Sequence, residues 1–484
     1  MKLIYKKSVK GRRGIRLPKS DVPYAPVLDD KYRRSVDAIL PEVSELDTVR
    51  HFTDLSKLNF SVDGNFYPLG SCTMKYNPKV LEAADSLEGF NALHPFIPIL
   101  SPEKEMASGA LEVLSGLQEM LSEITGMDMF TLQPMAGAQG ELAGILIIKA
   151  YHRKKNSDKK FIIVPDASHG TNPASAAIAG YEVITIPTDP SGQMDMDEFK
   201  KNLNGKTAAV IMTCPNTLGI FNTRIKEICE LAHSFDALMY YDGANMNAIM
   251  GKTRPGDMGF DIAHVNLHKT FGTPHGGGGP GAGPVGVKNS LGSFLPQPVI
   301  IKDSAGRITL SNDNPDSIGR IAPFYGNFGV LLKAFAYILL MGKDGLADIT
   351  EKAVLNANYI MEKLKGHYEL PYDRRCMHEC VFSALKQAEN GIRALDIAKY
   401  LIDKGIHPPT IYFPLIVKEA MMIEPTETES KQTLDGFIEN MIEAARLALE
   451  DPAKLHDTPV TGPVGRLDEV LAARNLDVSY KELL

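Results

Sequence analysis

Residues 265–287 read VNLHKTFGTPHGGGGPGAGPVGV, and this stretch decides the fold. A short apolar run leads into His268 and Lys269, and a loop dense in glycine follows. Upstream, residues 237–241 form another apolar run, which ends at Asp242. Short, continuously apolar runs between helical segments predict buried parallel strands, and ligands bind beyond the carboxyl ends of such strands. The lysine and the aspartate are therefore expected at one site.

A lysine and an aspartate in this arrangement suit pyridoxal phosphate (PLP). The lysine amine forms an imine with the aldehyde, and the carboxylate keeps the pyridine nitrogen protonated so that the ring accepts electrons. Lys269 could instead be a solvated surface lysine, and Asp242 could cap the following helix. The apolar run before Lys269 and the Thr270-Phe271 pair after it favour a functional lysine.

Three further polar loops fall at strand ends or helix starts of the same region. Residues 135–141 (MAGAQGE) lead directly into a helix, whose free N–H groups and dipole suit a phosphate. Residues 168–173 (SHGTNP) and 213–219 (TCPNTLG) follow two other predicted strands. His169 could be an ordinary polar loop residue, or its ring could stack on an aromatic cofactor. His268 and His275 lack a third ligand at a metal-binding spacing, so no metal site is predicted.

The composition is typical of a soluble globular protein. The chain has 484 residues, of which 44% are hydrophobic and 23% charged, and its net charge of −7 gives no reason to expect nucleic-acid binding. Five cysteines without disulfide spacing favour a reduced, cytoplasmic environment. No apolar run approaches membrane-spanning length. The first twenty residues carry eight Lys or Arg and no acid, which predicts a basic arm that docks on a partner subunit or a solvated tail.

The order of predicted elements indicates an α/β protein with a second, smaller α+β region. We expect an irregular arm over residues 1–90, a large α/β domain with a mostly parallel sheet over 91–326, and a small α+β domain with the tail over 327–484. Long helices are expected over 139–154, 328–342 and 346–365. Residues 376–380 (CMHEC) resemble a metal or redox site but lack a completing ligand pair, so we interpret them as core and surface residues of the small domain.

Several long motifs resemble one known family. They read PLGSCTMK (68–75), HPFIP (94–98), QPMAGAQGE (133–141), SHGTNPASA (168–176), YYDGANMNA (240–248) and NLHKTFGTPHGGGGPGAGPVG (266–286). Together they are similar to the carboxyl-terminal half of the glycine cleavage system P-protein, a PLP-dependent glycine dehydrogenase (decarboxylating). Residues 422–430 (MIEPTETES) in the small region also resemble this family.

The resemblance implies the fold and the assembly. The fold would be that of the PLP-dependent transferases of fold type I. Many P-proteins are one chain of about twice this length with two related halves. This chain has the lysine-bearing half, so it resembles subunit 2 of the split form. A subunit 1 partner in a heterotetramer of two copies each, and a lipoylated H-protein, are implied.

The resemblance also assigns roles to individual residues. Lys269 would hold the cofactor as an imine, Asp242 would pair with the pyridine nitrogen, and His169 would stack on the ring. The phosphate would contact Ala138, Gln139 and His268. Four more residues would lie near the cofactor: Thr213, Asn216, Thr171 and His275.

The implied reaction is the PLP-dependent decarboxylation of glycine, which releases CO2. The aminomethyl group would then pass to the lipoyl arm of H-protein. Two alternatives stay open at this point. One is another PLP-dependent amino-acid decarboxylase or lyase of the same fold, which would not depend on a lipoyl carrier. The other is a non-catalytic scaffold subunit, which the intact Lys269 and Asp242 disfavour.

Overall fold

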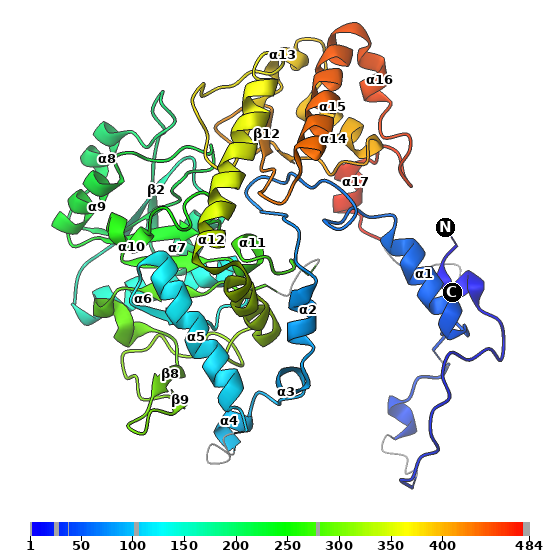
Figure 1. Ribbon diagram of the computed structural model, residues 1–484, viewed down its shortest axis with the longest axis horizontal. Coiled ribbons are helices and arrows are strands. Elements are labelled where there is room, and N and C mark those ends of the chain that lie inside the picture. Colours follow the sequence, from blue (N-terminus) through cyan, green and yellow to red (C-terminus); the bar gives the residue numbers. More distant parts are fainter. Residues whose placement is uncertain (1, 24–28, 37, 101–105, 277–280, 478–484) are drawn as a thin grey trace. The chain divides into compact units, whose positions relative to one another are not determined.

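The computed structural model describes residues 2–23, 29–36, 38–100, 106–276 and 281–477 (Figure 1). It divides into two compact units, of which residues 62–457 form the larger and residues 1–61 with 458–484 the smaller. The domain borders predicted at residues 90 and 326 both fall within the larger unit, and they stay a prediction. None of the helices among the described residues is both long and apolar enough to cross a membrane.

A seven-stranded sheet with helices on both faces forms the body of the larger unit, as the sequence predicts. The strand order is β1-β7-β6-β5-β4-β2-β3, and β7 is antiparallel to its neighbours β1 and β6, whereas the other pairs are parallel. The strands are β1 (Met129–Thr131), β2 (Phe161–Pro165), β3 (Glu182–Ile186), β4 (Thr207–Met212), β5 (Leu238–Gly243), β6 (Ile262–Val265) and β7 (Val285–Val287).

Strands β4 and β5 are buried along their whole length because each side of the sheet has its own hydrophobic core. Tyr240 and Tyr241 are neighbours in the sequence and point into different cores. The core around Tyr240 includes α6 (Gly137–Lys154) and α7 (Thr171–Ile178). The core around Tyr241 includes α5 (Ser108–Thr125), α8 (Met196–Asn202), α9 (Ile225–Ser234) and the first part of α12 (Phe328–Leu364).

A smaller α+β region follows α12 within the larger unit and is called the small domain below. It has its own hydrophobic core. Gly342 has non-helical backbone angles within α12, so the structure has two helices across a kink, close to the two that were predicted. The small sheet has the order β10-β12-β11 and is antiparallel. Its elements are β10 (Cys380–Ser383), β11 (Thr410–Ile411), β12 (Ala420–Ile423), α13 (Leu385–Ala388), α14 (Ala394–Asp403), α15 (Lys431–Glu450) and α16 (Pro452–His456).

The remaining elements are short and lie outside the two sheets. They are α1 (Glu45–Ser56), α2 (Val80–Asp85), α3 (Glu88–Asn91), α4 (Ile97–Leu100), α10 (Pro255–Met258), α11 (Leu267–Thr270), α17 (Glu469–Arg474), the hairpin β8 (Val299–Lys302) and β9 (Ile308–Ser311), and the 3-10 turns η1 (Ile4–Lys7), η2 (Asp30–Tyr32) and η4 (Asn289–Phe294). Of these, α11 carries Lys269.

Residues 67–75, called the strap below, connect the small sheet to the large one. Leu69 forms an antiparallel bridge with Ile423 at the end of β12. Farther along, the buried ammonium of Lys75 donates a hydrogen bond of 2.8 Å to the carboxylate of Glu427. A buried ion pair is costly to break from one side, typically by about 3–5 kcal/mol, so these contacts fix the strap in place. The strap thereby delivers Ser71 to the end of the large sheet.

Candidate active site

The predicted lysine and aspartate line one cavity at the carboxyl ends of β5 and β6. Asp242 is next to last in β5, and Lys269 lies in α11, directly after the adjacent parallel strand β6. The cavity has a volume of about 260 Å³. Six of the predicted site residues line it: Lys269, Asp242, His169, Thr171, Ala138 and Thr213.

The amine of Lys269 is buried and held by the strap. Lys269 is only 9% exposed, and its Nζ donates a hydrogen bond of 2.7 Å to the carbonyl oxygen of Ser71. Ser71 has a φ of 64°, in the left-handed region that non-glycine residues rarely adopt. A residue held there against its preference indicates that its surroundings determine its backbone, and such positions cluster at functional sites.

The carboxylate of Asp242 is 3% exposed and is hydrogen-bonded at both oxygens. Oδ2 accepts from Nδ2 of Asn172 at 3.0 Å, and Oδ1 accepts from the backbone N–H of Ala244 at 3.2 Å. The Nε2 atom of His264 lies 3.4 Å from Oδ1, but burial lowers the pKa of this histidine, so its ring is neutral. Oδ1 of Asp242 is therefore fixed by the turn that follows β5, and Oδ2 is fixed by Asn172 of α7.

His169 lies in a short chain of polar contacts at the start of α7. Its Nδ1 is 3.0 Å from Oγ1 of Thr171, which donates a hydrogen bond of 2.7 Å to Oε2 of Glu141. Burial lowers the pKa of His169, so its ring is neutral near pH 7. A neutral imidazole can stack on an aromatic ring without the cost of a buried charge.

The start of α6 offers free backbone donors to the same cavity. Gly137 and Ala138 line the cavity, and no side chain caps the helix at Ala136. The first N–H groups of a helix have no partner within the helix, and its dipole favours an anion there. Thr213 and Asn266 also line the cavity, and Oγ1 of Thr213 and Oδ1 of Asn266 are buried without a hydrogen-bond partner among the described residues.

Two of the predicted cofactor residues use their side chains elsewhere. Gln139 accepts from the backbone N–H of Met135 at 2.7 Å and donates to the carbonyl of Ile321 at 2.6 Å. Asn216 closes its own turn with Oδ1, which accepts the backbone N–H groups of Leu218 and Ile220, and its Nδ2 donates to the carbonyl of Gly192 at 2.7 Å. Neither residue lines the cavity, and their predicted roles stay predictions.

His268 and His275 also lie outside the cavity lining and pack against each other. Their ring centroids are 5.1 Å apart, and Nε2 of His275 is 3.3 Å from Sγ of Cys72 in the strap. Burial lowers the pKa of His268 to about 3 and that of His275 to about 4, so both rings are neutral. Residues 277–280 of the glycine-rich loop lie outside the described residues.

The small domain adds two cavity residues that the sequence reasoning missed. His378 and Glu379 line the cavity, and Glu424 is fully buried behind it. Cys376 and Cys380 are buried in the small-domain core, as interpreted from the sequence, but the two residues before Cys380 face the cavity. In the sequence, the feature that indicates such a role is that the ionisable residues His378 and Glu379 come directly before the buried strand β10.

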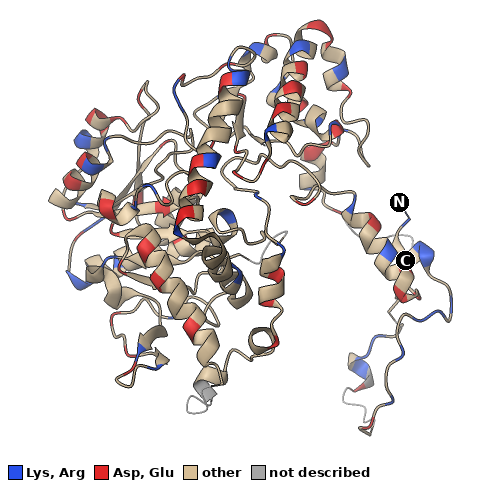
Figure 2. Ribbon diagram, viewed as in Figure 1, with Lys and Arg blue, Asp and Glu red and all other residues tan. Residues whose placement is uncertain are grey.

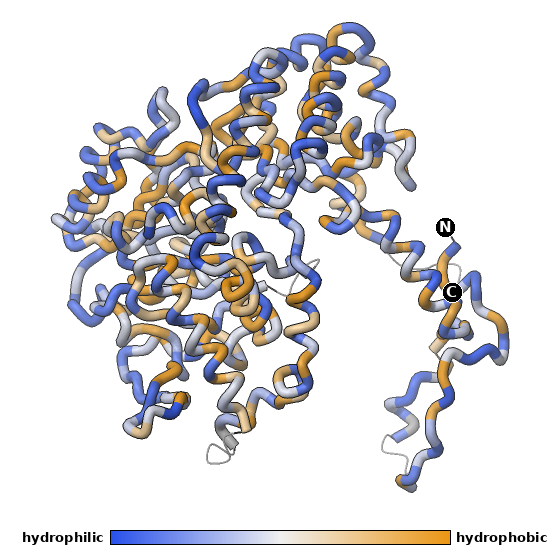
Figure 3. The backbone as a smooth tube through the Cα atoms, viewed as in Figure 1, coloured by the Kyte–Doolittle hydropathy of each residue, from blue (hydrophilic) through white to orange (hydrophobic). Residues whose placement is uncertain are grey.

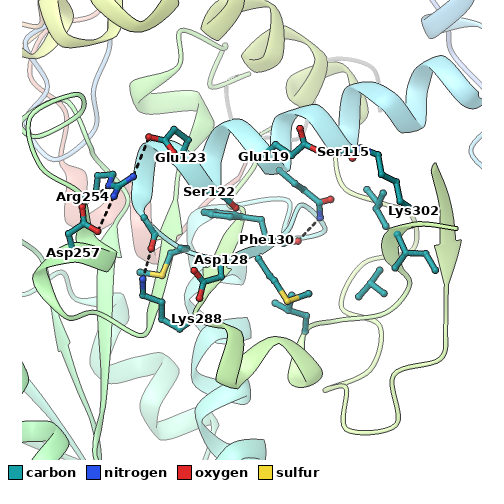
Figure 4. Close-up of a pocket in the computed structure, with 18 residues that line it drawn as sticks. Ser115, Glu119, Ser122, Glu123, Asp128, Phe130, Arg254, Asp257, Lys288 and Lys302 are labelled. Atoms are coloured by element: carbon teal, nitrogen blue, oxygen red, sulfur yellow. Dashed lines mark hydrogen bonds and ion pairs between the residues drawn. The ribbon is translucent and has the colours of Figure 1, made fainter. Parts of the chain in front are cut away.

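A larger surface cavity of about 670 Å³ lies beside α5 and does not resemble this site (Figure 4). Several of its charged groups are engaged with one another or with the backbone. Arg254 pairs with Glu123 and Asp257, and Lys288 donates to the carbonyl of Gly126 (Figure 4). The side chains of Arg254, Glu123 and Asp257 are largely exposed to solvent, whereas Lys269 is buried, so this cavity lacks the buried amine of the predicted site.

Glu141 gives the site a pH-dependent stability. Burial and the nearby Asp242 raise its pKa from 4.5 to about 7, so the folded state keeps a proton that the unfolded state releases between these values. Stability is therefore lost as the pH rises through this window. We expect Glu141→Gln to unfold like the wild type near pH 5 and to be more stable at pH 8, on the order of 2 kcal/mol. Thermal unfolding at both pH values tests this, with the exposed Glu182→Gln as control; equal stabilisation at both pH values would contradict it.

Comparisons with known proteins agree with this geometry. Residues 24–310 match the family model described as glycine cleavage system P-protein, and residues 349–452 match that of the glycine dehydrogenase C-terminal domain. A Staphylococcus saprophyticus protein named probable glycine dehydrogenase (decarboxylating) subunit 2 is 54% identical over 99% of this chain and 97% of its own. A Caldanaerobacter subterraneus protein of the same name is 55% identical over 98% and 97%.

Solved structures confirm the predicted fold. A glycine decarboxylase (P-protein) of the glycine cleavage system, in an inhibitor-bound form, aligns with a TM-score of 0.70 at 19% identity and covers 86% of this chain and 93% of its own. A Lactobacillus brevis glutamate decarboxylase aligns with a TM-score of 0.66 at 14% identity over 87% and 96%. The fold is thus that of the PLP-dependent enzymes of fold type I. The chain belongs to the glycine cleavage system P-protein family, and its predicted activity class, glycine dehydrogenase (decarboxylating), is confirmed.

Proposed function

We propose that this chain holds PLP on Lys269, decarboxylates glycine, and passes the aminomethyl group to the lipoyl arm of H-protein. One observation carries the proposal. The buried amine of Lys269 and the hydrogen-bonded carboxylate of Asp242 line a single cavity, at the ends of adjacent parallel strands. The relatives named glycine dehydrogenase (decarboxylating) subunit 2 support the choice of glycine.

The residues of the cavity fit PLP at each of its polar ends. The uncapped start of α6 at Gly137 and Ala138 suits the phosphate, and the buried, unpartnered Oγ1 of Thr213 is available to a polar group of the cofactor. Asp242 offers a carboxyl acceptor for a protonated ring nitrogen, and Lys269 offers the amine. When bound, PLP supplies an electron sink for the pair of electrons that remains when a carboxylate leaves as CO2.

The chain's own residues orient the reacting groups and control their charge. Asn172 and Ala244 fix the Asp242 carboxylate, so that it can hold a proton on a ring nitrogen without reorganising. The neutral ring of His169 offers an aromatic face. Ser71 holds Nζ of Lys269 in the cavity, and burial of this amine excludes water from its surroundings.

The relatives' designation as subunit 2 implies a partner, and we propose a subunit 1 in a heterotetramer of two copies each. The smaller unit has a surface suited to such a partner. No leucine, isoleucine, valine, phenylalanine or tyrosine is buried among its described residues, and Leu17 is 81% and Ile15 75% exposed. Hydrophobic residues recur along the chain of this unit (Figure 3). Lysines and arginines alternate with these apolar residues in the sequence, and several lie in this unit (Figure 2). Such a segment gains stability only when another surface covers it.

We place the assembly in the cytoplasm. The five cysteines are all unpaired in the structure, and four of them are buried. Unpaired thiols without disulfides are typical of a reducing compartment, which supports this location.

Lys269→Ala should remove the visible absorbance of bound PLP, because no amine remains to form the imine. Borohydride reduction of the wild type should fix PLP on the peptide that contains Lys269, as mass spectrometry would detect. Lys302→Ala, in the larger surface cavity, is the matched control and should retain the absorbance. PLP fixed on another lysine, or full absorbance in Lys269→Ala, would refute the assignment.

Replacing Ile15 and Leu17 together by serine should weaken binding to subunit 1 at least tenfold, because each buried aliphatic side chain contributes about 1.5–3 kcal/mol. Isothermal titration calorimetry with purified subunit 1 measures the effect. Leu449→Ser, at a residue of α15 that is 71% exposed, is the control and should bind like the wild type. Unchanged affinity of the double variant would show that the arm does not dock there.

A further inference from the structure

Two buried glutamates of the small domain lie together behind the strap. Glu379 is 3% exposed and Glu424 is fully buried. One carboxylate oxygen of each, together with a ring nitrogen of His378, lies within a group whose atoms are all within 4.8 Å of one another. Two carboxyl groups at this separation in a buried site repel each other strongly when both are ionised.

The strap connects these two carboxyls to Lys269. Ser71 uses both of its backbone groups, because its N–H donates to Oε2 of Glu379 at 2.8 Å while its carbonyl accepts from Nζ of Lys269 at 2.7 Å. Oγ1 of Thr73 donates to Oε1 of Glu424 at 2.5 Å, and Nδ2 of Asn245 donates to the same oxygen at 2.8 Å. Ser71 therefore contacts both Glu379 and the amine of Lys269, and Thr73 contacts Glu424.

The charged neighbours leave the pair with too little positive charge for two carboxylates. Lys75 is already paired with Glu427, which itself adds a negative charge near Glu424. Burial lowers the pKa of His378 to about 3, so its ring is neutral. Lys269 is the cation that acts on both glutamates. Burial and mutual repulsion raise the pKa of Glu379 to about 8, and burial is the largest cause that raises that of Glu424 to about 7.

One carboxyl oxygen of the pair accepts no hydrogen bond from the described residues. Oε2 of Glu424 is buried and has no hydrogen-bond partner among the described residues, whereas its Oε1 has two donors. An ionised carboxylate oxygen without a donor in a buried site is costly, but a protonated one is itself a donor. The geometry thus has room for one proton on the pair.

We propose that Glu379 and Glu424 share a single proton, hold one negative charge between them, and so act as positioning residues that set the protonation of the Lys269 nitrogen. The part about Lys269 with its cofactor rests on the proposed function, whereas the shared proton does not. Because the two carboxyls are coupled, the proton belongs to the pair and not to either glutamate. If either carboxyl group is removed, the other is ionised and the pair still carries one negative charge near Lys269. If both are removed, this charge is lost.

Infrared difference spectroscopy on the chain without PLP tests the shared proton directly. Between pH 6 and pH 9 (about one pH unit beyond the pKa values of about 7 and 8), a protonated-carboxyl band should disappear in the reference protein. Every protein compared, the reference included, also carries Glu141→Gln, because burial raises the pKa of Glu141 to about 7 and its carboxyl would give a band in the same pH window. In this background the band should be absent from the Glu379→Gln/Glu424→Gln variant and retained in Glu389→Gln, an exposed glutamate of the same domain. An identical band in the reference and in the Glu379→Gln/Glu424→Gln variant would overturn the proposal. So would a reference band that emerges only after a chelator is added, because a cation would then occupy the pair.

The absorbance of PLP bound to Lys269, titrated with pH, tests the effect on the amine. Each single glutamine variant should keep the wild-type midpoint, and the double variant should lower it by about one pH unit, because a negative charge is lost nearby. Equal shifts from the two single variants that add up in the double variant would show two independent carboxylates and refute sharing. An unchanged midpoint in the double variant would refute the positioning role. Failure of the wild type to bind PLP would count against the proposed function, while the infrared result would still decide on the pair.

Discussion

The burial of one amine is the constraint on which the site depends. Taking a lysine ammonium out of water is costly unless acceptors and negative charge compensate it. The carbonyl of Ser71 accepts from Lys269, and the carboxyl groups of Asp242, Glu379 and Glu424 supply negative charge nearby. Together with Lys269, these groups come from α11, the strap, β5 and the small domain, so the amine can be buried only when all of these segments are assembled.

The same constraint explains why the small domain and the strap matter to chemistry at the end of the large sheet. The ion pair between Lys75 and Glu427 and the bridge between Leu69 and Ile423 hold the strap against the small domain. The strap in turn presents the carbonyl of Ser71, in a left-handed backbone conformation, to the amine. A disturbance of the small domain would therefore reach Lys269 through the backbone of the strap, without any movement of the large sheet.

Local sequence patterns predicted the sheet and the residues next to it. Apolar runs at 237–241 and 263–267 correspond to β5 and β6, and the polar residues that follow them, Asp242 and Lys269, line the cavity. The glycine-containing turn before α6 likewise predicted the start of a helix with free backbone N–H donors. These features are local, since a strand and the loop that follows it are specified by adjacent residues.

The rest of the site depends on contacts that local patterns do not report. Ser71 is 198 residues from Lys269 along the chain, and Thr73 is 351 residues from Glu424. Periodicity shows that a residue is buried but not which distant segment it meets. It also does not show whether a polar side chain is consumed by its own turn, as in Asn216, or faces a cavity, as in Thr213.

Glycine-dependent exchange of labelled bicarbonate into the carboxyl group of glycine tests the central claim most directly. The assay combines this chain with PLP, subunit 1 and lipoylated H-protein, and it omits each component in turn. The proposed function predicts exchange that requires H-protein and is poor without subunit 1. Absence of exchange with glycine, together with decarboxylation of a different amino acid, would contradict the account and make the chain another decarboxylase of the same fold.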